Sequence, residues 1–214
     1  MAVVCVPLGY ATTSFLFGFE YGISALNFSG FSWYGAVFFM PICILILGSL
    51  MENFLDIKPS DYIHNLAAPL ALMNGFMKVA CLVFGCCYGY PCSWGYYNSF
   101  AGTTVFPIQL VEAIWNFAVC GFILWYERKP ENRSKVYPMY MIIYSIGRIF
   151  LEFGRSNAEI NFKPLFGVIK GGMIYAAIAI CIGLIWIKID KNYQAKKNVK
   201  KKKTVHGGKD GWRK

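Results

Sequence analysis

Charged residues are scarce in this sequence. Asp, Glu, Lys and Arg make up only 15% of the 214 residues, whereas 57% are hydrophobic and the mean hydropathy is +0.44. A soluble domain averages about 25% charged and roughly 45–50% apolar residues. This shortage of charge excludes a soluble globular fold with a large core. It predicts a protein that crosses a membrane several times.

Cysteine pairs with metal-ligand spacing are also missing. The chain has 8 cysteines, but no two of them form a CxxC pair. Several lie in apolar runs, where cysteine behaves as a small hydrophobic residue. The spacing therefore predicts no zinc site, and we expect no other metal and no cofactor. Cys86, Cys87 and Cys92 are close enough in sequence for a disulfide if their loop faces an oxidising compartment.

The apolar residues are grouped into six runs, each of a length suited to a membrane-spanning helix of about 20 residues. The runs are Val4–Ile23, Ser32–Met51, Ile63–Phe84, Ile108–Tyr126, Val136–Phe153 and Gly171–Ile187. The first has neither a basic segment before it nor a small-residue cleavage site, so we do not interpret it as a signal peptide. We predict an all-α, polytopic membrane bundle of about six transmembrane helices in residues 1–190. A basic tail of residues 191–214 is expected to be disordered.

Positive charge is concentrated at the C-terminal end. The net charge is +10, and much of it lies in Lys196–Lys214, which in so apolar a chain indicates attraction to anionic lipid rather than to nucleic acid. Basic segments stay on the cytoplasmic side of a membrane. This rule places the tail and the basic loop 127–135 inside, and six spans then place the N-terminus inside as well. The loop 85–107 contains no charged residue and falls outside.

One apolar run carries a stripe of charges. Arg148, Glu152 and Arg155 are spaced so that an α-helix presents them on one face. Charges inside a membrane span usually face an interior cavity, and two guanidinium groups with a carboxylate between them suit a bound phosphate. The alternative is that the arginines extend to the headgroups at a helix end. That alternative fits Arg155, whereas the deeper Arg148 is interpreted as functional.

Other polar residues are expected at the same depth. Gln109 and Glu112 share one helix face inside an apolar run, and their burial requires partners, for which the arginine stripe is the obvious candidate. Lys78 falls near the outer end of its own run. Gly85 and Gly89 punctuate a turn that would let the backbone approach a ligand closely. A tight outer turn flanked by interfacial tyrosines is an alternative of equal weight.

Five motifs resemble those of the prolipoprotein diacylglyceryl transferase family, and they follow one another along the chain in the family's order. The most specific is the run from Tyr144 to Arg155, which is similar to the family helix Tyr-Gly-x-x-Arg-x-x-x-Glu-Phe-x-Arg. Residues 106–112, Phe-Pro-Ile-Gln-Leu-Val-Glu, resemble His-Pro-x-Gln-Leu-Tyr-Glu. The other three lie at residues 30–35, 59–69 and 78–89, and the last resembles a signature-loop variant that ends in Gly-Cys-Cys-Tyr-Gly. The resemblance runs from about Gly30 to Arg155.

The resemblance implies the family's fold and reaction. In that reaction a lipobox cysteine thiol of a prolipoprotein attacks the glyceryl carbon of phosphatidylglycerol, glycerol 1-phosphate leaves, and a thioether-linked diacylglyceryl group remains. It implies a place in the bacterial cytoplasmic membrane, with the phospholipid and the prolipoprotein as partners and no nucleic acid. It implies catalytic roles for Arg148, Glu152, Tyr34 and Lys78, and substrate-binding roles for Arg155, Gln109, Glu112, Gly85, Gly89 and Cys81.

The sequence departs from the family pattern where protons are handled. Tyr34 stands at the position of the family's essential histidine, and a phenol with a pKa of about 10 is a poor base at neutral pH. Lys78 replaces an arginine, which keeps the charge but loses the two-pronged fork, and Phe106 replaces another histidine. Glu112 or Glu152 would then take the thiol proton, or the thiol would ionise unaided beside the arginine.

Three functions therefore stand side by side. The first is a working transferase on phosphatidylglycerol or another anionic phospholipid, acting on prolipoproteins or, as a divergent paralogue, on another acceptor. The second is a catalytically impaired membrane protein that binds anionic phospholipid, which the tyrosine at position 34 and an expected loss of the family's first span favour. The third is a thiol-redox protein built on Cys86 and Cys87.

Overall fold

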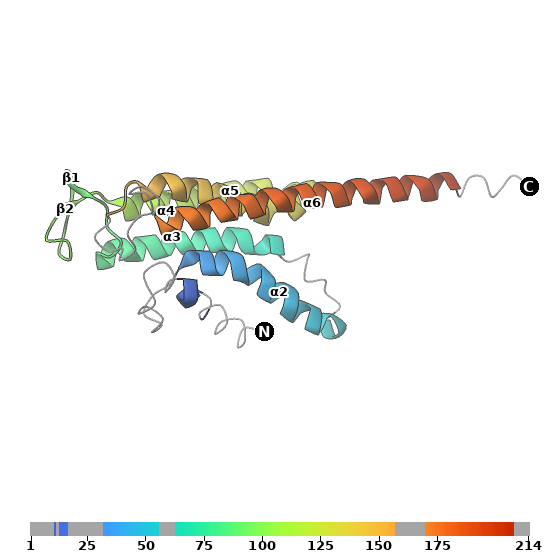
Figure 1. Ribbon diagram of the computed structural model, residues 1–214, viewed down its shortest axis with the longest axis horizontal. Helices are drawn as coiled ribbons and strands as arrows, with labels where there is room; N and C mark the ends of the chain where they lie inside the picture. The colour runs from blue at the N-terminus through green and yellow to red at the C-terminus, as the bar shows by residue number, and fades with distance from the viewer. Residues whose placement is uncertain (1–10, 12, 17–31, 56–62, 157–169, 208–214) are drawn as a thin grey trace, which may run out of the picture.

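The structure, a computed structural model, describes residues 11, 13–16, 32–55, 63–156 and 170–207. The first predicted span, Val4–Ile23, therefore lies mostly outside the described residues. Helices dominate the rest of the chain (Figure 1). They are α2 (Trp33–Leu55), the short 3₁₀ helix η3 (Ile63–Leu66), α3 (Ala67–Phe84), α4 (Ile108–Tyr126), the 3₁₀ helix η4 (Pro130–Asn132), α5 (Arg133–Glu152) and α6 (Gly171–Gly207).

The predicted outer loop between α3 and α4 contains a β-hairpin. Strand β1 (Pro91–Asn98) pairs antiparallel with β2 (Thr103–Val105), and its register is broken between Pro91 and Tyr96. The side-chain oxygen of Asn98 closes the turn by accepting hydrogen bonds from the backbone N–H groups of the two residues at 100 and 101. The hairpin lies at one end of the helices (Figure 1), which is called the hairpin end below.

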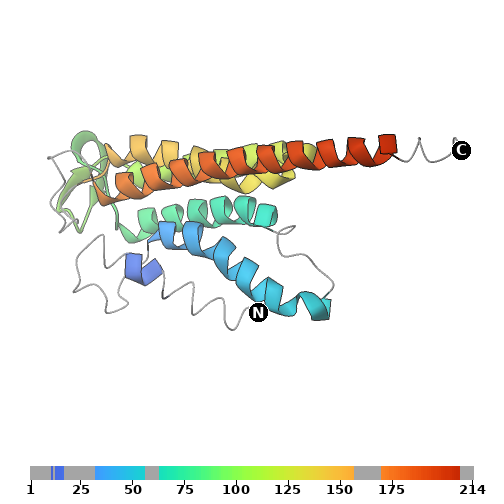
Figure 2. The same ribbon diagram turned by 45° about the vertical axis from the view of Figure 1, so that its right-hand side comes forward.

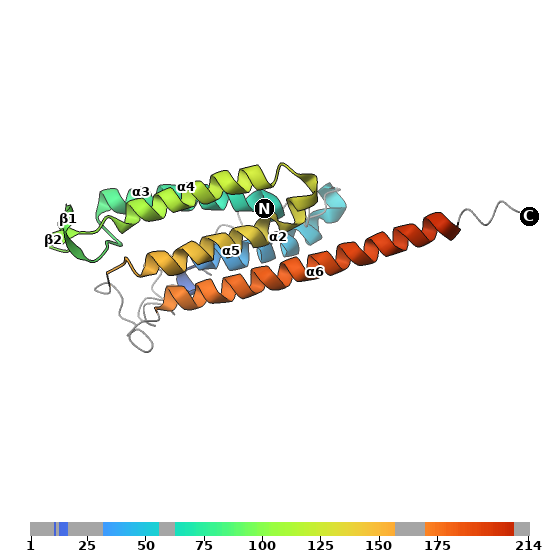
Figure 3. The same ribbon diagram turned by 90° about the horizontal axis from the view of Figure 1, so that it is seen from above.

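The helices alternate in direction and pack in pairs. α3 packs along α4, α5 packs along α6, and α4 contacts α5 (Figure 3). Of these three pairs, only α4 and α5 are joined by a short connection, residues 127–132, of the kind that makes neighbouring helices antiparallel. Because the directions alternate, the last turns of α3 and α5 and the first turns of α4 and α6 all lie at the hairpin end (Figure 1). Segments that are far apart in the sequence meet there.

Tyrosines form the contact between α2 and α5. Tyr137 and Tyr140 are fully buried, and a buried hydroxyl needs a hydrogen-bond partner. The Tyr137 hydroxyl donates to the backbone oxygen of Val37 at 2.7 Å, and the indole N–H of Trp33 donates to the Tyr140 hydroxyl at 3.1 Å. These contacts involve only the first part of α2. Its later part diverges from α3 (Figure 2).

Four of the described helical segments are long and apolar enough to cross a membrane: Trp33–Leu50, Ile63–Phe84, Ile108–Tyr126 and Gly171–Ala195. The fifth predicted span falls on α5, which is not one of them because charged and polar side chains lower its hydropathy. Many large apolar side chains of the helices are exposed, among them Val83, Phe150 and Ile185. An apolar helix surface of this kind suits a lipid environment. The chain is a mostly helical membrane protein.

The last helix is longer than a membrane span. α6 continues to Gly207, so much of the tail that was expected to be disordered from residue 191 is helical in the structure. Lysine, alanine and glutamine are good helix formers, and elongating an existing helix requires no new nucleation. Residues 208–214 lie outside the described residues.

Candidate active site

Four charged side chains from three helices meet near the hairpin end. The Lys78 ammonium of α3 lies 2.8 Å from Oε2 of Glu112 of α4. The Arg148 guanidinium of α5 contacts the other oxygen of Glu112 through Nη1, and its Nη2 lies 2.7 Å from Oε2 of Glu152. Of the predicted stripe of Arg148, Glu152 and Arg155, the first two form an i, i+4 ion pair on α5, whereas the helix ends at Glu152 and Arg155 follows it. Lys78, Glu112, Arg148 and Glu152 are called the ion cluster below.

The ion cluster is buried and electrically balanced. Glu112 and Glu152 are each only 1% exposed, and Arg148 is 9% exposed. Two cations and two carboxylates give the cluster no net formal charge. Moving an ion out of water costs roughly several kcal/mol, and ion pairing with hydrogen bonds is needed to offset this cost. Polar networks set among lipid-facing helices usually mark a functional site.

Amides surround the ion cluster but leave little space. Asn116 of α4 donates a hydrogen bond to the Glu112 backbone oxygen at 2.7 Å and accepts one from Asn74 of α3 at 3.0 Å. The cavity among these residues measures about 10 Å³, which is about the space that one water molecule requires. As arranged here, the cavity is therefore too small for a group the size of a phosphate.

Arg155 lies beside the ion cluster, in the connection after α5. It is 8% exposed, and its backbone forms an antiparallel bridge with Gly89. A side chain at Gly89 would meet the Phe106 carbonyl oxygen at 2.5 Å. Gly89 was predicted to let the backbone approach a ligand. The structure shows it permitting close approach of the chain to itself.

Lys170 is a charged neighbour that the sequence analysis did not consider. Its ammonium donates hydrogen bonds to the backbone oxygens of Glu152 at 2.7 Å and Arg155 at 2.9 Å. Burial lowers the pKa of the Lys170 ammonium, although the Glu152 carboxylate opposes that effect. A single lysine just before the last apolar run was the only signal in the sequence.

Gln109 does not join the ion cluster. Its amide nitrogen donates to the Cys86 backbone oxygen at 2.8 Å and to the Tyr96 hydroxyl at 2.9 Å. Of the two α4 residues expected to pair with the arginine stripe, only Glu112 does so. Gly85 ends α3 with a φ of +75°, a conformation that favours glycine. Gln109 and Gly85 thus shape the turn that leads out of α3.

Tyr34 is buried next to the ion cluster rather than in it. Its ring packs against Tyr144, with 5.6 Å between ring centroids, and against Phe38 and Tyr175. Tyr144 precedes Arg148 by one helical turn on the same face of α5. Tyr34 is 3% exposed. The structure therefore packs this predicted catalytic residue on Tyr144, and no ion pair of the cluster includes it.

Cys81 has two sulfur neighbours. The sulfur atoms of Cys81, Cys86 and Cys87 all lie within 4.8 Å of one another, a grouping that the sequence analysis did not anticipate. The hydrogen bond from the Cys81 thiol lowers the pKa of Cys87 to about 5, with help from the charges of Arg155 and Lys78 and against the opposing effect of burial.

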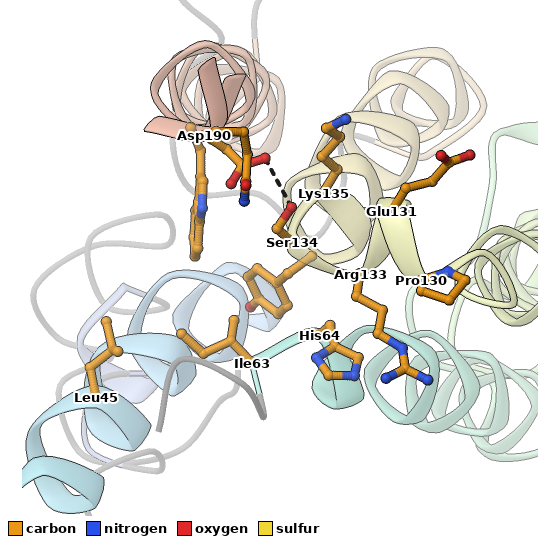
Figure 4. A pocket seen from close by; sticks show the side chains of 12 residues that line it. Leu45, Ile63, His64, Pro130, Glu131, Arg133, Ser134, Lys135 and Asp190 are labelled. Atoms are coloured by element: carbon orange, nitrogen blue, oxygen red, sulfur yellow. Dashed lines mark hydrogen bonds between the residues drawn. The ribbon is translucent and has the colours of Figure 1, made fainter. Parts of the chain in front are cut away.

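A much larger cavity of about 880 Å³ lies where α2 diverges from α5 and α6 (Figure 4). Arg133, Lys135 and His64 line it together with Trp186. Across it, the Ser134 hydroxyl donates a hydrogen bond of 2.9 Å to the Asp190 carboxylate. None of the predicted site residues lines this cavity. It is therefore separate from the ion cluster.

The chain is similar to known proteins along most of its length. A model of the prolipoprotein diacylglyceryl transferase family matches residues 1–189. The chain is 33% identical over 162 residues to phosphatidylglycerol–prolipoprotein diacylglyceryl transferase 2 of Clostridium perfringens. This match covers 69% of this chain and 62% of that protein. It is 31% identical over 175 residues to the corresponding transferase of Clostridium tetani, covering 76% of this chain and 65% of that protein.

These matches have definite limits. The chain spans less than two thirds of the length of these two relatives, and no solved structure is significantly similar to it. The family match nevertheless includes every predicted site residue and all helices up to the first half of α6. On this evidence, the chain belongs to the prolipoprotein diacylglyceryl transferase family.

Proposed function

We propose that the protein transfers the diacylglyceryl group of phosphatidylglycerol to the lipobox cysteine thiol of prolipoproteins. The ion cluster is the observation that carries this proposal. Lys78, Glu112, Arg148 and Glu152 come from three apolar helices and are paired at a depth where an unpaired charge would be very costly. The printed names of the relatives state the same substrates for those proteins.

Arg148 is the proposed phosphate clamp. When the glyceryl C–O bond breaks, negative charge grows on the phosphate, and a fixed cation in a water-poor site stabilises that charge. A guanidinium binds phosphate with the same parallel pair of hydrogen bonds that it offers a carboxylate. In the proposed reaction, the phosphate replaces Glu112 or Glu152 on Arg148, while Lys78 keeps the released charge balanced.

Arg155 and Gln109 have supporting roles in this proposal. Arg155 extends the positive region beyond the end of α5, and Gln109 holds the Cys86 backbone and the Tyr96 hydroxyl in place. Gly85 and Gly89 permit the tight backbone geometry around the site. Tyr34 packs against Tyr144, so its role is positioning rather than proton transfer.

The proposed topology places the site in the outer half of the bacterial cytoplasmic membrane. The hairpin end carries the uncharged segment 85–107. The basic loop 127–135 and the lysine-rich end of α6 lie at the opposite end of the bundle (Figure 1). Basic segments stay inside, so six spans with both termini in the cytoplasm fit this arrangement. Residues 1–190 form the membrane domain, and the basic tail follows.

A transfer assay tests the proposed function. Purified protein in lipid is mixed with headgroup- and acyl-labelled phosphatidylglycerol and a lipobox-cysteine peptide. The wild type moves acyl label to the peptide and releases headgroup label. The double variant Arg148→Gln/Glu152→Gln keeps the cluster neutral and loses about 10²–10³-fold in rate, the usual cost of removing a donor to a developing negative charge.

The matched control is Arg133→Gln, because Arg133 lines the separate cavity of Figure 4. This control is expected to retain transfer. Loss of transfer in Arg133→Gln, with full activity in the ion-cluster variant, would place the chemistry at the other end of the bundle and contradict the proposal. Melting temperatures of both variants in detergent show whether either has simply unfolded.

The second candidate function is binding of anionic phospholipid without transfer. The full internal pairing of the ion cluster and the cavity of about 10 Å³ beside it favour this candidate. It predicts that labelled phosphatidylglycerol remains bound to the wild type while no label reaches the peptide at any protein concentration.

A further inference from the structure

Three cysteine sulfurs converge where α3 ends. Cys81 lies in the last turn of α3, and Cys86 and Cys87 follow in the turn that leads to the hairpin. All three sulfur atoms lie within 4.8 Å of one another. Cys86 is exposed, and Cys81 and Cys87 are half-buried. The group is therefore reachable from outside the bundle.

The backbone is held in an uncommon conformation to bring these sulfurs together. Cys87 has a φ of +56°, and Cys87 is the only non-glycine residue with positive φ in the described part of the chain. Such a conformation is unfavourable for a residue with a side chain and persists where the surroundings impose it. Here Gln109 binds the Cys86 backbone oxygen at 2.8 Å, and Asn98 binds the Gly85 backbone oxygen at 2.7 Å.

Three thiolates are a fitting ligand set for zinc. Tetrahedral Zn²⁺ with Zn–S bonds of about 2.3 Å requires sulfurs roughly 3.8 Å apart. The observed spacing needs to shrink by no more than about 1 Å to meet that geometry. Zinc with three protein ligands keeps a fourth position open, which is the arrangement of a catalytic rather than a structural zinc site.

The charges around the cysteines favour such a complex. Three thiolates on Zn²⁺ carry a net charge of −1, and a fourth thiolate makes it −2. The cations Arg155 and Lys78 act on Cys87 and offset this negative charge, while the Glu112 carboxylate opposes them. Lys78 also lies one turn before Cys81 on the same face of α3, and it contacts Glu112. The cysteines are therefore next to the ion cluster.

We propose that Cys81, Cys86 and Cys87 bind one Zn²⁺, whose fourth position takes the acceptor thiol as a thiolate. The zinc site is inferred from the cysteine geometry, whereas the identity of the fourth ligand rests on the proposed function. A thiol that coordinates a metal is deprotonated outright. Zinc would thus generate the thiolate nucleophile without a separate base. Among the described residues of the site, Glu112 and Glu152 are held in ion pairs and Tyr34 is buried.

The proposed step balances without any redox change. The acceptor thiol releases its proton to water when its sulfur binds zinc. The sulfur then attacks the glyceryl carbon and an S–C bond forms. The bond between that carbon and the phosphate oxygen breaks, and its electron pair stays on the oxygen. Glycerol phosphate leaves with one more negative charge, and Arg148 binds it. The thioether product binds zinc weakly and departs.

Metal binding is measured first, independently of transfer. Full-length protein is stripped of metal under reducing conditions and titrated with Zn²⁺, and separately with Co²⁺. We expect one Zn²⁺ per chain and a sulfur-to-cobalt charge-transfer band. Cys81→Ser, Cys86→Ser and Cys87→Ser each weaken binding by more than about 100-fold, since even a lost outer partner costs 10–100-fold. Cys92→Ser, in β1 and outside the cluster, binds as the wild type does.

Several results would overturn the zinc site. They are binding of less than one metal per chain, equal binding in the Cys81, Cys86 and Cys87 variants, or a disulfide between two of these cysteines in freshly isolated protein. Melting temperatures of all variants identify any that fail to fold. The Cys92→Ser control shows whether a lost thiol in this region has a general effect.

The transfer assay then separates the inference from the proposed function. Transfer should fall on metal removal, return with Zn²⁺, and stay low in Cys87→Ser at saturating Zn²⁺. Full transfer by metal-free protein would overturn the zinc role and leave the proposed function standing. Zinc bound by the three cysteines, with no transfer by any preparation, would leave the site standing and defeat the proposed function.

Discussion

Glu112 is the residue on which the ion cluster depends. It is the only member that contacts both cations, since one oxygen faces Lys78 and the other faces Arg148. Its partners come from the two helices that flank α4. Removing one member of a buried charge network leaves the others uncompensated, which is far more costly than losing a surface ion pair. The stability of the bundle and the charge of its site therefore depend on the same side chain.

Replacing Glu112 by glutamine should destabilise the protein strongly. The change leaves a buried net positive charge, and breaking a buried pair in this way costs about 3–5 kcal/mol. The double variant Lys78→Met/Glu112→Gln should recover much of that loss, because it removes the uncompensated cation. Chemical denaturation in detergent measures both. Glu131→Gln, which lies in η4 away from the cluster, is the control and should be neutral.

Gly89 is constrained by the backbone around it. A Cβ there would lie 2.5 Å from the Phe106 oxygen and 2.9 Å from the Gly154 oxygen. Gly89→Ala should therefore lower the free energy of unfolding by about 1–3 kcal/mol, the usual cost of overpacking. Gly121→Ala in α4 has open space around the new methyl group and should leave stability unchanged or raise it slightly. A Gly89→Ala variant as stable as the wild type would contradict this geometry.

At the scale of elements, α5 connects the site to the rest of the bundle. Its tyrosines form hydrogen bonds with α2, its charged residues lie among side chains of α3 and α4, and the helix packs along α6. At its C-terminal end, tight turns give the backbone oxygens of residues 150, 151 and 152 partners in the N–H groups of residues 153, 154 and 155. Lys170, at the start of α6, donates to two oxygens there.

Lys170→Met should weaken the junction between α5 and α6. Two hydrogen bonds from a charged donor disappear, and such bonds contribute about 1.5–3 kcal/mol when buried. The partial exposure of Lys170 places the expected loss toward the lower figure. Amide hydrogen exchange should rise at the end of α5. Lys188→Met, on an exposed part of α6, is the matched control, and equal effects of the two changes would contradict the capping role.

At the scale of the whole molecule, charge divides the bundle into two ends. The hairpin end contains the buried ion cluster and the cysteines, and the opposite end contains the basic loop, the 880 Å³ cavity and the long basic extension of α6. Negative lipid headgroups and the membrane potential both hold basic segments inside. In the proposed topology, this asymmetry directs the site outward.

This orientation can be measured with proteases. Trypsin should remove the lysine-rich end of α6 in inside-out membrane vesicles and leave it intact in whole cells with the outer surface exposed. A protease site inserted between Asn98 and Thr103, in the hairpin turn, should show the reverse pattern. Cleavage of the tail from outside would contradict the proposed topology and would move the site to the cytoplasmic half.

The sequence by itself determined the features that depend on near neighbours along the chain. Run length and scarcity of charge predicted the four described helices that are long and apolar enough to cross a membrane. The i, i+4 spacing predicted the Arg148–Glu152 pair, because a helix places these two residues on one face. The motifs gave the family, which the family model matches independently.

Only the tertiary structure decided which distant residues meet. It paired Glu112 with Lys78 and Arg148, bonded Gln109 to the Cys86 backbone instead, and packed Tyr34 against Tyr144. It also brought together three cysteines whose spacing had indicated no metal site. Helix packing and the left-handed turn after α3 fix these contacts, and both depend on the whole chain rather than on any local pattern.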